Sequence, residues 1–239
     1  MHHLVLAAAM VVPRRFLVAR HGLTNWNQEG RIQGTLDLSE LTAEGVDQAE
    51  ALGAHIASTE VVGAVWCSPL RRARQTLAAI EAKCAEGGRS LPPPIIHDNL
   101  KEIDLYGWHG QLKTDIEKTE PEAWLRWKSN PQAYRTPEGA APLPELWERA
   151  RSSWRLLLAA ETVDTTLVVA HGAFNRCLVA SALGCDIDAF RDSRFQFENC
   201  AMFELVFHGD DLATWRKVFT PSSNGQEVAT PPVVAGAFF

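Results

Sequence analysis

The chain has 239 residues, of which 46% are hydrophobic and 22% charged, values typical of one globular domain. Its 29 acidic side chains outnumber its 23 lysines and arginines, so the net charge of -6 excludes the basic excess of proteins that bind nucleic acids or anionic membrane surfaces. The longest apolar run, Leu4 to Val12, is shorter than the roughly 20 residues that cross a bilayer, and we expect no membrane-spanning segment.

Short apolar runs, which predict buried strands, alternate along the chain with longer segments of helical periodicity. Thr42, for example, can cap a helix that places Ala49, Leu52 and Ile56 on one face. This alternation predicts an α/β fold, a three-layer αβα sandwich with a mainly parallel central sheet. The predicted strands and helices, in chain order, are strand 16–19, helix 42–56, strand 62–66, helix 69–85, strand 95–96, helix 143–160, strand 166–170, helix 172–183 and strand 201–207.

The stretch from about residue 107 to residue 144 breaks this alternation with five prolines and three tryptophans. We interpret it as a lid insertion that covers a site, within a single domain that spans residues 1–220. Residues 221–239 are rich in Ser, Asn, Gly and Pro, a composition that predicts a poorly ordered tail.

Two of the predicted strands end in a histidine followed by a glycine, His21-Gly22 and His171-Gly172, and Arg20 precedes the first pair. Ligands of open α/β sheets bind outside the carboxyl ends of the strands, so we expect both histidines in one crevice. A glycine lets an oxyanion approach the backbone, and the free N–H groups of the helix that Gly172 begins favour an anion. The sequence therefore predicts an anion site at this edge of the sheet.

Four blocks of the sequence resemble the histidine phosphatase superfamily, also called phosphoglycerate mutase-like proteins. Residues 20–27, RHGLTNWN, are similar to its R-H-G-x-S/T-x-x-N opening, and residues 68–76, SPLRRARQT, to its S-x-L-x-R-A-x-Q-T element. Residues 100–110 resemble its L-x-E…G-x-x-G element, and residues 171–176 its H-G-x-x-x-R element. The blocks follow the family's order, and the resemblance implies a phosphoglycerate mutase-like fold.

The resemblance also implies a metal-independent, cofactor-free phosphatase that acts through a phosphohistidine. It makes His21 the nucleophile and Glu102 the acid that protonates the leaving group. Arg20 and Arg72 would grip the phosphoryl oxygens, and His171, cationic with a dianion bound, would stabilise the transferring group. Arg71 and Arg74, which flank Arg72, we interpret as surface cations. The expected substrate-binding residues are Thr24, Asn27, Gln33, Gly34, Gly172 and Tyr106.

A narrower resemblance concerns the substrate. Blocks at 37–42, 101–106, 145–150 and 168–171 are similar to the branch of the plant chloroplast 2-carboxyarabinitol 1-phosphate phosphatases, which favours a small sugar phosphate. Arg31, Lys113 or Lys128 would then meet the substrate carboxylate.

Mutases of the superfamily usually carry an arginine directly after the acid and an arginine pair in the insertion. Here Ile103 follows Glu102, and no arginine pair occurs between Glu102 and Pro144. A cofactor-dependent phosphoglycerate mutase is therefore the alternative enzyme. A catalytically silent module that binds phospho-ligands is the alternative of another class.

The expected partner is a small phosphorylated substrate, with neither nucleic acid nor membrane, and a homodimer is left open. The five cysteines are odd in number and show no metal or disulfide spacing, which indicates a reducing compartment. We accordingly expect an intracellular protein, located in the chloroplast stroma in a photosynthetic eukaryote and in the cytoplasm otherwise.

Overall fold

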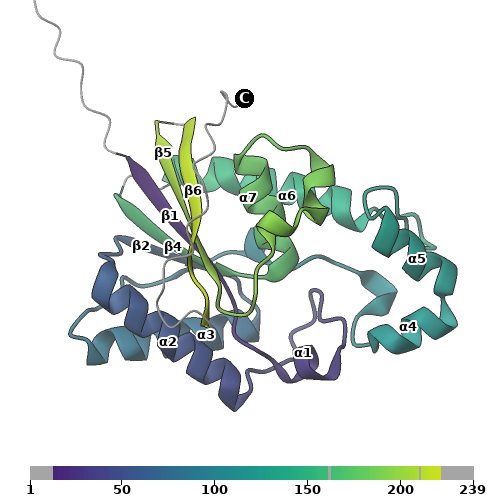
Figure 1. Cartoon of the computed structure of the whole chain (residues 1–239), viewed down its shortest axis with the longest axis horizontal. Helices are drawn as coiled ribbons and strands as arrows, with labels where there is room; N and C mark the ends of the chain where they lie inside the picture. The colour runs from purple at the N-terminus through teal and green to yellow at the C-terminus, as the bar shows by residue number, and fades with distance from the viewer. Residues whose placement is uncertain (1–12, 161–162, 210, 222–239) are drawn as a thin grey trace, which may run out of the picture.

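One six-stranded sheet with helices on both faces forms the centre of the computed structural model, which describes residues 13–160, 163–209 and 211–221 (Figure 1). The predicted tail lies, apart from Pro221, outside the described residues, as does the apolar run before Pro13. None of the helices in these three ranges has the length and apolar character that a bilayer crossing requires.

The strands are arranged in the order β3-β2-β4-β1-β5-β6. Strands β3, β2, β4 and β1 pair in parallel, whereas β5 is antiparallel to both β1 and β6, so the predicted α/β architecture is confirmed. Strand β6 is absent from the predicted elements because Thr214, Arg216 and Lys217 interrupt its apolar pattern at a sheet edge. The strands are β1 (Arg14–Arg20), β2 (Ala64–Cys67), β3 (Ile95–Ile96), β4 (Thr165–Ala170), β5 (Met202–His208) and β6 (Asp211–Phe219).

Helices α2 and α3 lie on one side of the sheet, and α6 and α7 on the other (Figure 1). The four predicted helices are confirmed with small shifts of their ends, and Thr42 caps α2 by accepting a hydrogen bond from Gly45 N–H. The α-helices are α1 (Asn25–Glu29), α2 (Ala43–Thr59), α3 (Arg71–Glu86), α4 (Lys113–Thr119), α5 (Pro121–Ser129), α6 (Pro142–Ala160) and α7 (Gly172–Ala182).

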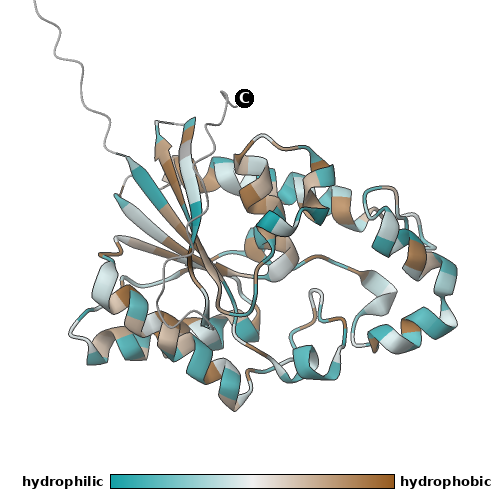
Figure 2. Ribbon diagram, in the orientation of Figure 1, coloured by the Kyte–Doolittle hydropathy of each residue, from teal (hydrophilic) through white to brown (hydrophobic). Residues whose placement is uncertain are grey.

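Strand β1 separates two hydrophobic cores. Leu17 and Ala19 pack with α2 and α3, and Phe16 and Val18 pack with α6 and α7. Successive side chains of a strand point to opposite faces, so a continuous apolar run fills both cores at once. The central strands are accordingly hydrophobic along most of their length (Figure 2).

The 107–144 stretch contains α4 and α5, neither of which is among the predicted elements. Helices this short carry little periodic signal, and tertiary packing stabilises them. Trp108 supplies packing for α5, because its ring centroid lies 5.7 Å from that of Trp124, and it also lies 5.0 Å from that of Tyr134. Helix α4 is anchored by Ile116, which is fully buried in the same core. Figure 1 shows α4 and α5 on the side of the molecule away from α2 and α3. That this stretch acts as a lid stays a prediction.

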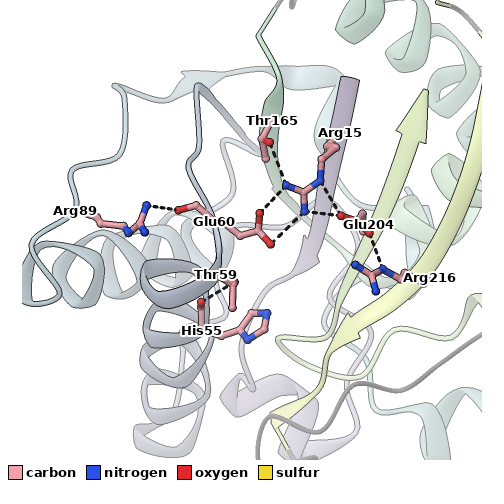
Figure 3. Close-up of polar contacts among 8 residues, drawn as sticks. All are labelled: Arg15, His55, Thr59, Glu60, Arg89, Thr165, Glu204 and Arg216. Carbon is pink, nitrogen blue, oxygen red and sulfur yellow. Dashed lines mark hydrogen bonds and ion pairs between the residues drawn. The ribbon is translucent and has the colours of Figure 1, made fainter. Parts of the chain in front are cut away.

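An ion-pair network at the amino end of β1 joins this strand to β5, β6 and the end of α2 (Figure 3). Arg15 donates to Glu60, directly after α2, at 2.9 Å, and its Nε donates to Glu204 of β5 at 2.8 Å. Arg216 of β6 donates to the other oxygen of Glu204 at 2.6 Å. Burial opposes ionisation of Glu204, but the hydrogen bonds from Arg216 and Arg15 outweigh it and hold its pKa below the ordinary value of 4.5.

We expect Glu204→Gln to lower the free energy of unfolding by about 2 kcal/mol at pH 7, since it removes the buried carboxylate to which Arg15 and Arg216 both donate. A carboxylate with a lowered pKa stabilises the fold above its ordinary pKa of 4.5 and loses that effect as the pH falls further, so the difference from wild type should shrink below pH 4.5. Urea unfolding across pH tests both points. Glu148→Gln, which alters an exposed pair with Arg151, is the control and should shift stability by less than about 0.5 kcal/mol.

Candidate active site

The pairing of β1 with β4 brings the two strand-end histidines together. Arg20 lies opposite Ala170 in this parallel register, so His21 and His171 follow at the same level. Their ring centroids are 5.3 Å apart, and both side chains are buried. Both imidazoles therefore lie next to each other at the carboxyl ends of these strands.

His21 has the tautomer that a nucleophile needs. Its Nδ1 lies 2.8 Å from the carbonyl oxygen of Gly22, which accepts only, so Nδ1 carries the proton and donates it. Nε2 is left with its lone pair. Burial, followed by the charges of Arg20 and Arg72, lowers the pKa of His21 well below 6.5, and the ring is neutral at physiological pH.

His171 is held between Ser68 and Arg72. Arg72 Nε donates to its Nδ1 at 3.2 Å, so the proton sits on Nε2, which donates to Ser68 Oγ at 2.7 Å. Ser68 follows β2, the strand on the other side of β4. Burial and then Arg72 lower the pKa of His171 well below 6.5. The expected cationic form with a dianion bound stays a prediction, and in this structure the ring is neutral.

Arg72, near the start of α3, is fully buried and holds the loop before α2. Its guanidinium donates to the carbonyl oxygens of Gly34 at 2.7 Å and Leu36 at 3.0 Å. Burial lowers the pKa of Arg72 to about 10, so the side chain still carries its charge at pH 7. At Gly34 the φ angle is +52°, and a Cβ would lie 2.0 Å from His109 Nε2, so only glycine fits.

Arg20 has an unused hydrogen-bond donor beside the start of α7. One terminal nitrogen donates to the carbonyl oxygen of Phe197 at 2.7 Å, while the buried Nε has no partner among the described residues. A Cβ added to Gly172, the first residue of α7, would lie 3.3 Å from this Nε. A buried donor without a partner beside a helix start is the arrangement that an anion satisfies.

Glu102 binds the first turn of α7. Its Oε2 accepts from Ala173 N–H at 3.1 Å and its Oε1 from Phe174 N–H at 3.0 Å. Arg149 of α6 fixes the segment that carries it, because it donates to the carbonyl oxygens of Glu102 and Asn99, each at 2.8 Å. The predicted acid therefore lies at the helix that begins beside His171.

The predicted substrate-binding residues mostly make contacts with the protein itself. Thr24 and Asn27 form the capping box of α1, and Asn199 links the Asn27 side chain to the carbonyl oxygen of His21. Gln33 accepts from Ser39 Oγ at 2.7 Å, beside Gly34.

Tyr106 differs from the other predicted contacts because its hydroxyl donates to Glu145 Oε2 at 2.6 Å, which raises the pKa of Tyr106 to about 12. The hydroxyl is thus already hydrogen-bonded to Glu145 of α6. Tyr106 also has a left-handed φ of 52°, and its N–H donates to Asp104 Oδ1 at 2.8 Å. A substrate contact by Tyr106 stays a prediction.

Three further residues belong to the site and have no site role in the sequence analysis: Ser68, Arg149 and Asn199. Ser68 opens the second motif, so its place in the pattern is the signal that identifies it. Arg149 lies on α6, three residues after the buried Leu146 and four before the buried Ser153, so helical spacing places it on the inward face. A charged residue on that face is a weaker signal. For Asn199, in a loop before β5, the sequence carries no comparable pattern.

Comparison with known families agrees with this geometry. The family model of the histidine phosphatase superfamily (branch 1) matches residues 16–218. The match includes both histidines, both arginines and Glu102, and the chain belongs to this superfamily.

Curated relatives include a probable 2-carboxy-D-arabinitol-1-phosphatase of Arabidopsis thaliana, 38% identical over 81% of this chain, and the 2-carboxy-D-arabinitol-1-phosphatase of Triticum aestivum, 36% identical over 74%. The chain spans only 38% and 34% of the lengths of these two plant proteins. The probable phosphoglycerate mutase GpmB of Klebsiella pneumoniae is 34% identical over 80% of this chain and 83% of its own.

Solved structures show the same fold. A putative alpha-ribazole-5'-P phosphatase from Escherichia coli superposes with a TM-score of 0.75 at 22% identity, over 87% of this chain and 97% of that one. A mycobacterial glucosyl-3-phosphoglycerate phosphatase gives 0.70 at 27% identity, over 86% and 97%. The expected phosphoglycerate mutase-like sandwich is confirmed.

We expect the imidazoles of His21 and His171 to stay neutral as the pH falls through 6.5, because burial and neighbouring arginines lower both pKa values. Imidazole ¹⁵N chemical shifts measure the protonation of the two rings across pH, and the variants His21→Ala and His171→Ala assign the signals. The urea-unfolded chain is the control, since its histidines should titrate near their ordinary pKa. Because the unfolded state takes up protons that the native state does not, stability should also fall below pH 6.5. Protonation of both rings near 6.5 would contradict the assignment.

Proposed function

We propose that this protein is a phosphatase that hydrolyses a small sugar phosphate through a phosphohistidine on His21. The observation that carries the proposal is the neutral His21, with its unprotonated Nε2, in a site with the half-buried Arg20 and the fully buried Arg72. A nucleophile that is already deprotonated next to positive charge suits attack on a phosphate dianion. Membership of the histidine phosphatase superfamily and the names of the plant relatives support the same activity.

In the first step, His21 Nε2 attacks phosphorus and the bond from phosphorus to the sugar oxygen breaks. The sugar alkoxide takes a proton from Glu102, since an alkoxide is a poor leaving group. Arg20 and Arg72 hold the equatorial oxygens through their planar forks, and Arg20 Nε gains the partner that it lacks.

In the second step, water attacks the phosphohistidine and gives its proton to the ionised Glu102. The bond from phosphorus to Nε2 breaks, and His21 returns to its neutral form, with Nδ1 still protonated and donating to the Gly22 carbonyl oxygen. Glu102 Oε2 accepts one hydrogen bond from the described residues and keeps a lone pair for the transferred proton. Helix α7 and Arg149 keep this carboxylate in one place through both steps.

Hydrolysis is favoured over mutase activity because the 107–144 stretch has no arginine pair and two of its five lysines and arginines already make contacts within the protein. Arg135, for example, donates to the carbonyl oxygens of Gln132 and Tyr134. Lys128 lies over the ring of Trp124, 5.7 Å from its centroid. The mutase reaction is the alternative to be tested, because a probable phosphoglycerate mutase is among the relatives.

Lys113, the first residue of α4, is the best candidate to bind a second anionic group of the substrate. Partial burial, then Arg20, then Lys128 lower its pKa, which indicates a cation close to the phosphate-binding arginine. No carboxylate among the described residues pairs with it. Arg31, by contrast, already pairs with Glu29 and donates to the carbonyl oxygen of Gly110. A carboxylate on the sugar, as in 2-carboxyarabinitol 1-phosphate, would relieve the repulsion at Lys113.

Phosphate release in the presence of EDTA tests the activity, with 2-carboxyarabinitol 1-phosphate, sugar bisphosphates, 3-phosphoglycerate and p-nitrophenyl phosphate as substrates. His21→Ala should lower the rate about a thousandfold or more because the covalent route is lost, and Glu102→Gln should slow the sugar substrates. His208→Ala, at an exposed position at the end of β5, is the matched control and should keep wild-type rates. Primer-dependent conversion of 3-phosphoglycerate without phosphate release would identify a mutase. Phosphate binding with no turnover would identify a catalytically silent module.

We expect Lys113→Met to lower kcat/KM for 2-carboxyarabinitol 1-phosphate about tenfold, since one charge contact to the carboxylate is lost. The value for p-nitrophenyl phosphate, which has no carboxylate, should change by less than about twofold. Lys118→Met, on the same helix, is the control and should affect neither substrate. An equal loss on both substrates would show that Lys113 serves the phosphoryl group instead.

A further inference from the structure

The ring of His109 joins two loops and has no part in the proposed reaction. The first loop, residues 33–36, is held by Arg72, which donates to the carbonyl oxygen of Gly34 at 2.7 Å. The second loop, residues 104–109, ends at His109 itself. The His109 side chain is only 12% exposed and packs on Gly34, where an added Cβ would lie 2.0 Å from Nε2 and 2.2 Å from Cδ2. The ring thus fills the space that a side chain at position 34 would need.

The same ring closes the second loop through a hydrogen bond. Leu105 N–H donates to His109 Nε2 at 2.9 Å, so Nε2 keeps its lone pair and the proton of the neutral ring lies on Nδ1. Tyr106, between these two residues, has a left-handed φ of 52°, which a residue other than glycine keeps only where its surroundings impose it. The bond to His109 spans Tyr106 and helps to hold this conformation.

A second partner for Nε2 lies close to the first. Asp104 Oδ1 is 3.3 Å from His109 Nε2, within reach of a protonated ring. The two interactions exclude each other, because a nitrogen that carries a proton cannot accept from Leu105 N–H. Protonation of His109 therefore forms an ion pair with Asp104 and leaves the N–H of the buried Leu105 without its acceptor.

Two charged side chains among the described residues act on the ring. Burial lowers the pKa of His109 below 6.5, Asp104 raises it, and Arg72 of α3 lowers it. The 33–36 loop contributes only neutral side chains, and Glu145 of α6 already accepts two hydrogen bonds. The ring is therefore neutral at pH 7 and takes up a proton only below pH 6.5.

We propose that His109 is a positioning residue for Arg72. In its neutral form the ring fixes the 104–109 loop against Gly34, and protonation of the ring releases this contact. Gly34 supplies a carbonyl oxygen that orients the Arg72 guanidinium, so movement of Gly34 changes the grip on the phosphoryl oxygens. The effect on turnover rests on the proposed function, whereas the hydrogen bond and its loss do not.

The hydrogen bond can be measured without any assay of activity. A scalar coupling between the nitrogens of Leu105 and His109 Nε2 should be present at about pH 8 and should weaken toward about pH 5, as the ring takes up its proton. His208→Gln changes an exposed histidine and is the matched control, in which the coupling should behave as in wild type. A coupling that is absent, or that does not change over this range, would overturn the proposal.

The pH profile of turnover tests the positioning role. In His109→Gln the amide oxygen can accept from Leu105 N–H and does not titrate, so kcat/KM for p-nitrophenyl phosphate should stay within about twofold of wild type at about pH 8. Toward about pH 5, wild type should lose at least about threefold more of its kcat/KM than His109→Gln, because only its ring is protonated. The His208→Gln control should follow wild type throughout.

His109→Leu removes the acceptor at every pH and should lower kcat/KM about fivefold already at about pH 8. Urea midpoints check that each variant is folded, and the comparison with His109→Gln stands even where His109→Leu is too unstable to assay. Parallel pH profiles of wild type and His109→Gln would reject the positioning role. If the chain turns over no substrate, the proposed function fails, and the dissociation constant of inorganic phosphate replaces kcat/KM in the same comparison.

Discussion

The parallel pairing of β1 with β4 is the constraint on which the candidate site depends. It places two histidines, 150 residues apart in the chain, at one level with their ring centroids 5.3 Å apart. The same sheet order puts β2 on the far side of β4, so Ser68 and α3, with Arg72, reach His171 from the next strand. A shift of one residue between these strands would separate the two imidazoles, because it turns each side chain to the other face.

The site holds more positive charge than its own carboxylate balances. Arg20 and Arg72 lower the pKa of His21, and each buried guanidinium is stabilised by backbone carbonyl oxygens as well as by Glu102. Both imidazoles are therefore neutral, because two protonated rings would add positive charge to a site whose arginines already lack counter-ions. An anion that enters the crevice supplies what the buried cations lack, which is the electrostatic basis of the proposed reaction.

Local patterns predicted the parts of this structure that carry strong local signals. The apolar strands 16–19 and 166–170, the helices around them and the residues in family motifs, such as His21 and Glu102, could be read from the sequence. Helices α4 and α5 could not, because they are stabilised by burial of Ile116 and by packing of Trp124 against Trp108, which periodicity does not reveal. The support of Glu102 by Arg149 depends on a contact between residues 47 positions apart, which no local pattern encodes.

The hydrogen bonds from Ala173 and Phe174 to Glu102 link catalysis to folding. A carboxylate that accepts the free N–H groups of a helix's first turn stabilises that helix, as a capping residue does. Active-site residues often reduce the stability of a protein, so that their removal makes it more stable. At Glu102 this conflict is absent, because the side chain proposed to transfer protons also secures the start of α7. Selection for a stable chain and selection for an active one would therefore favour the same residue at this position.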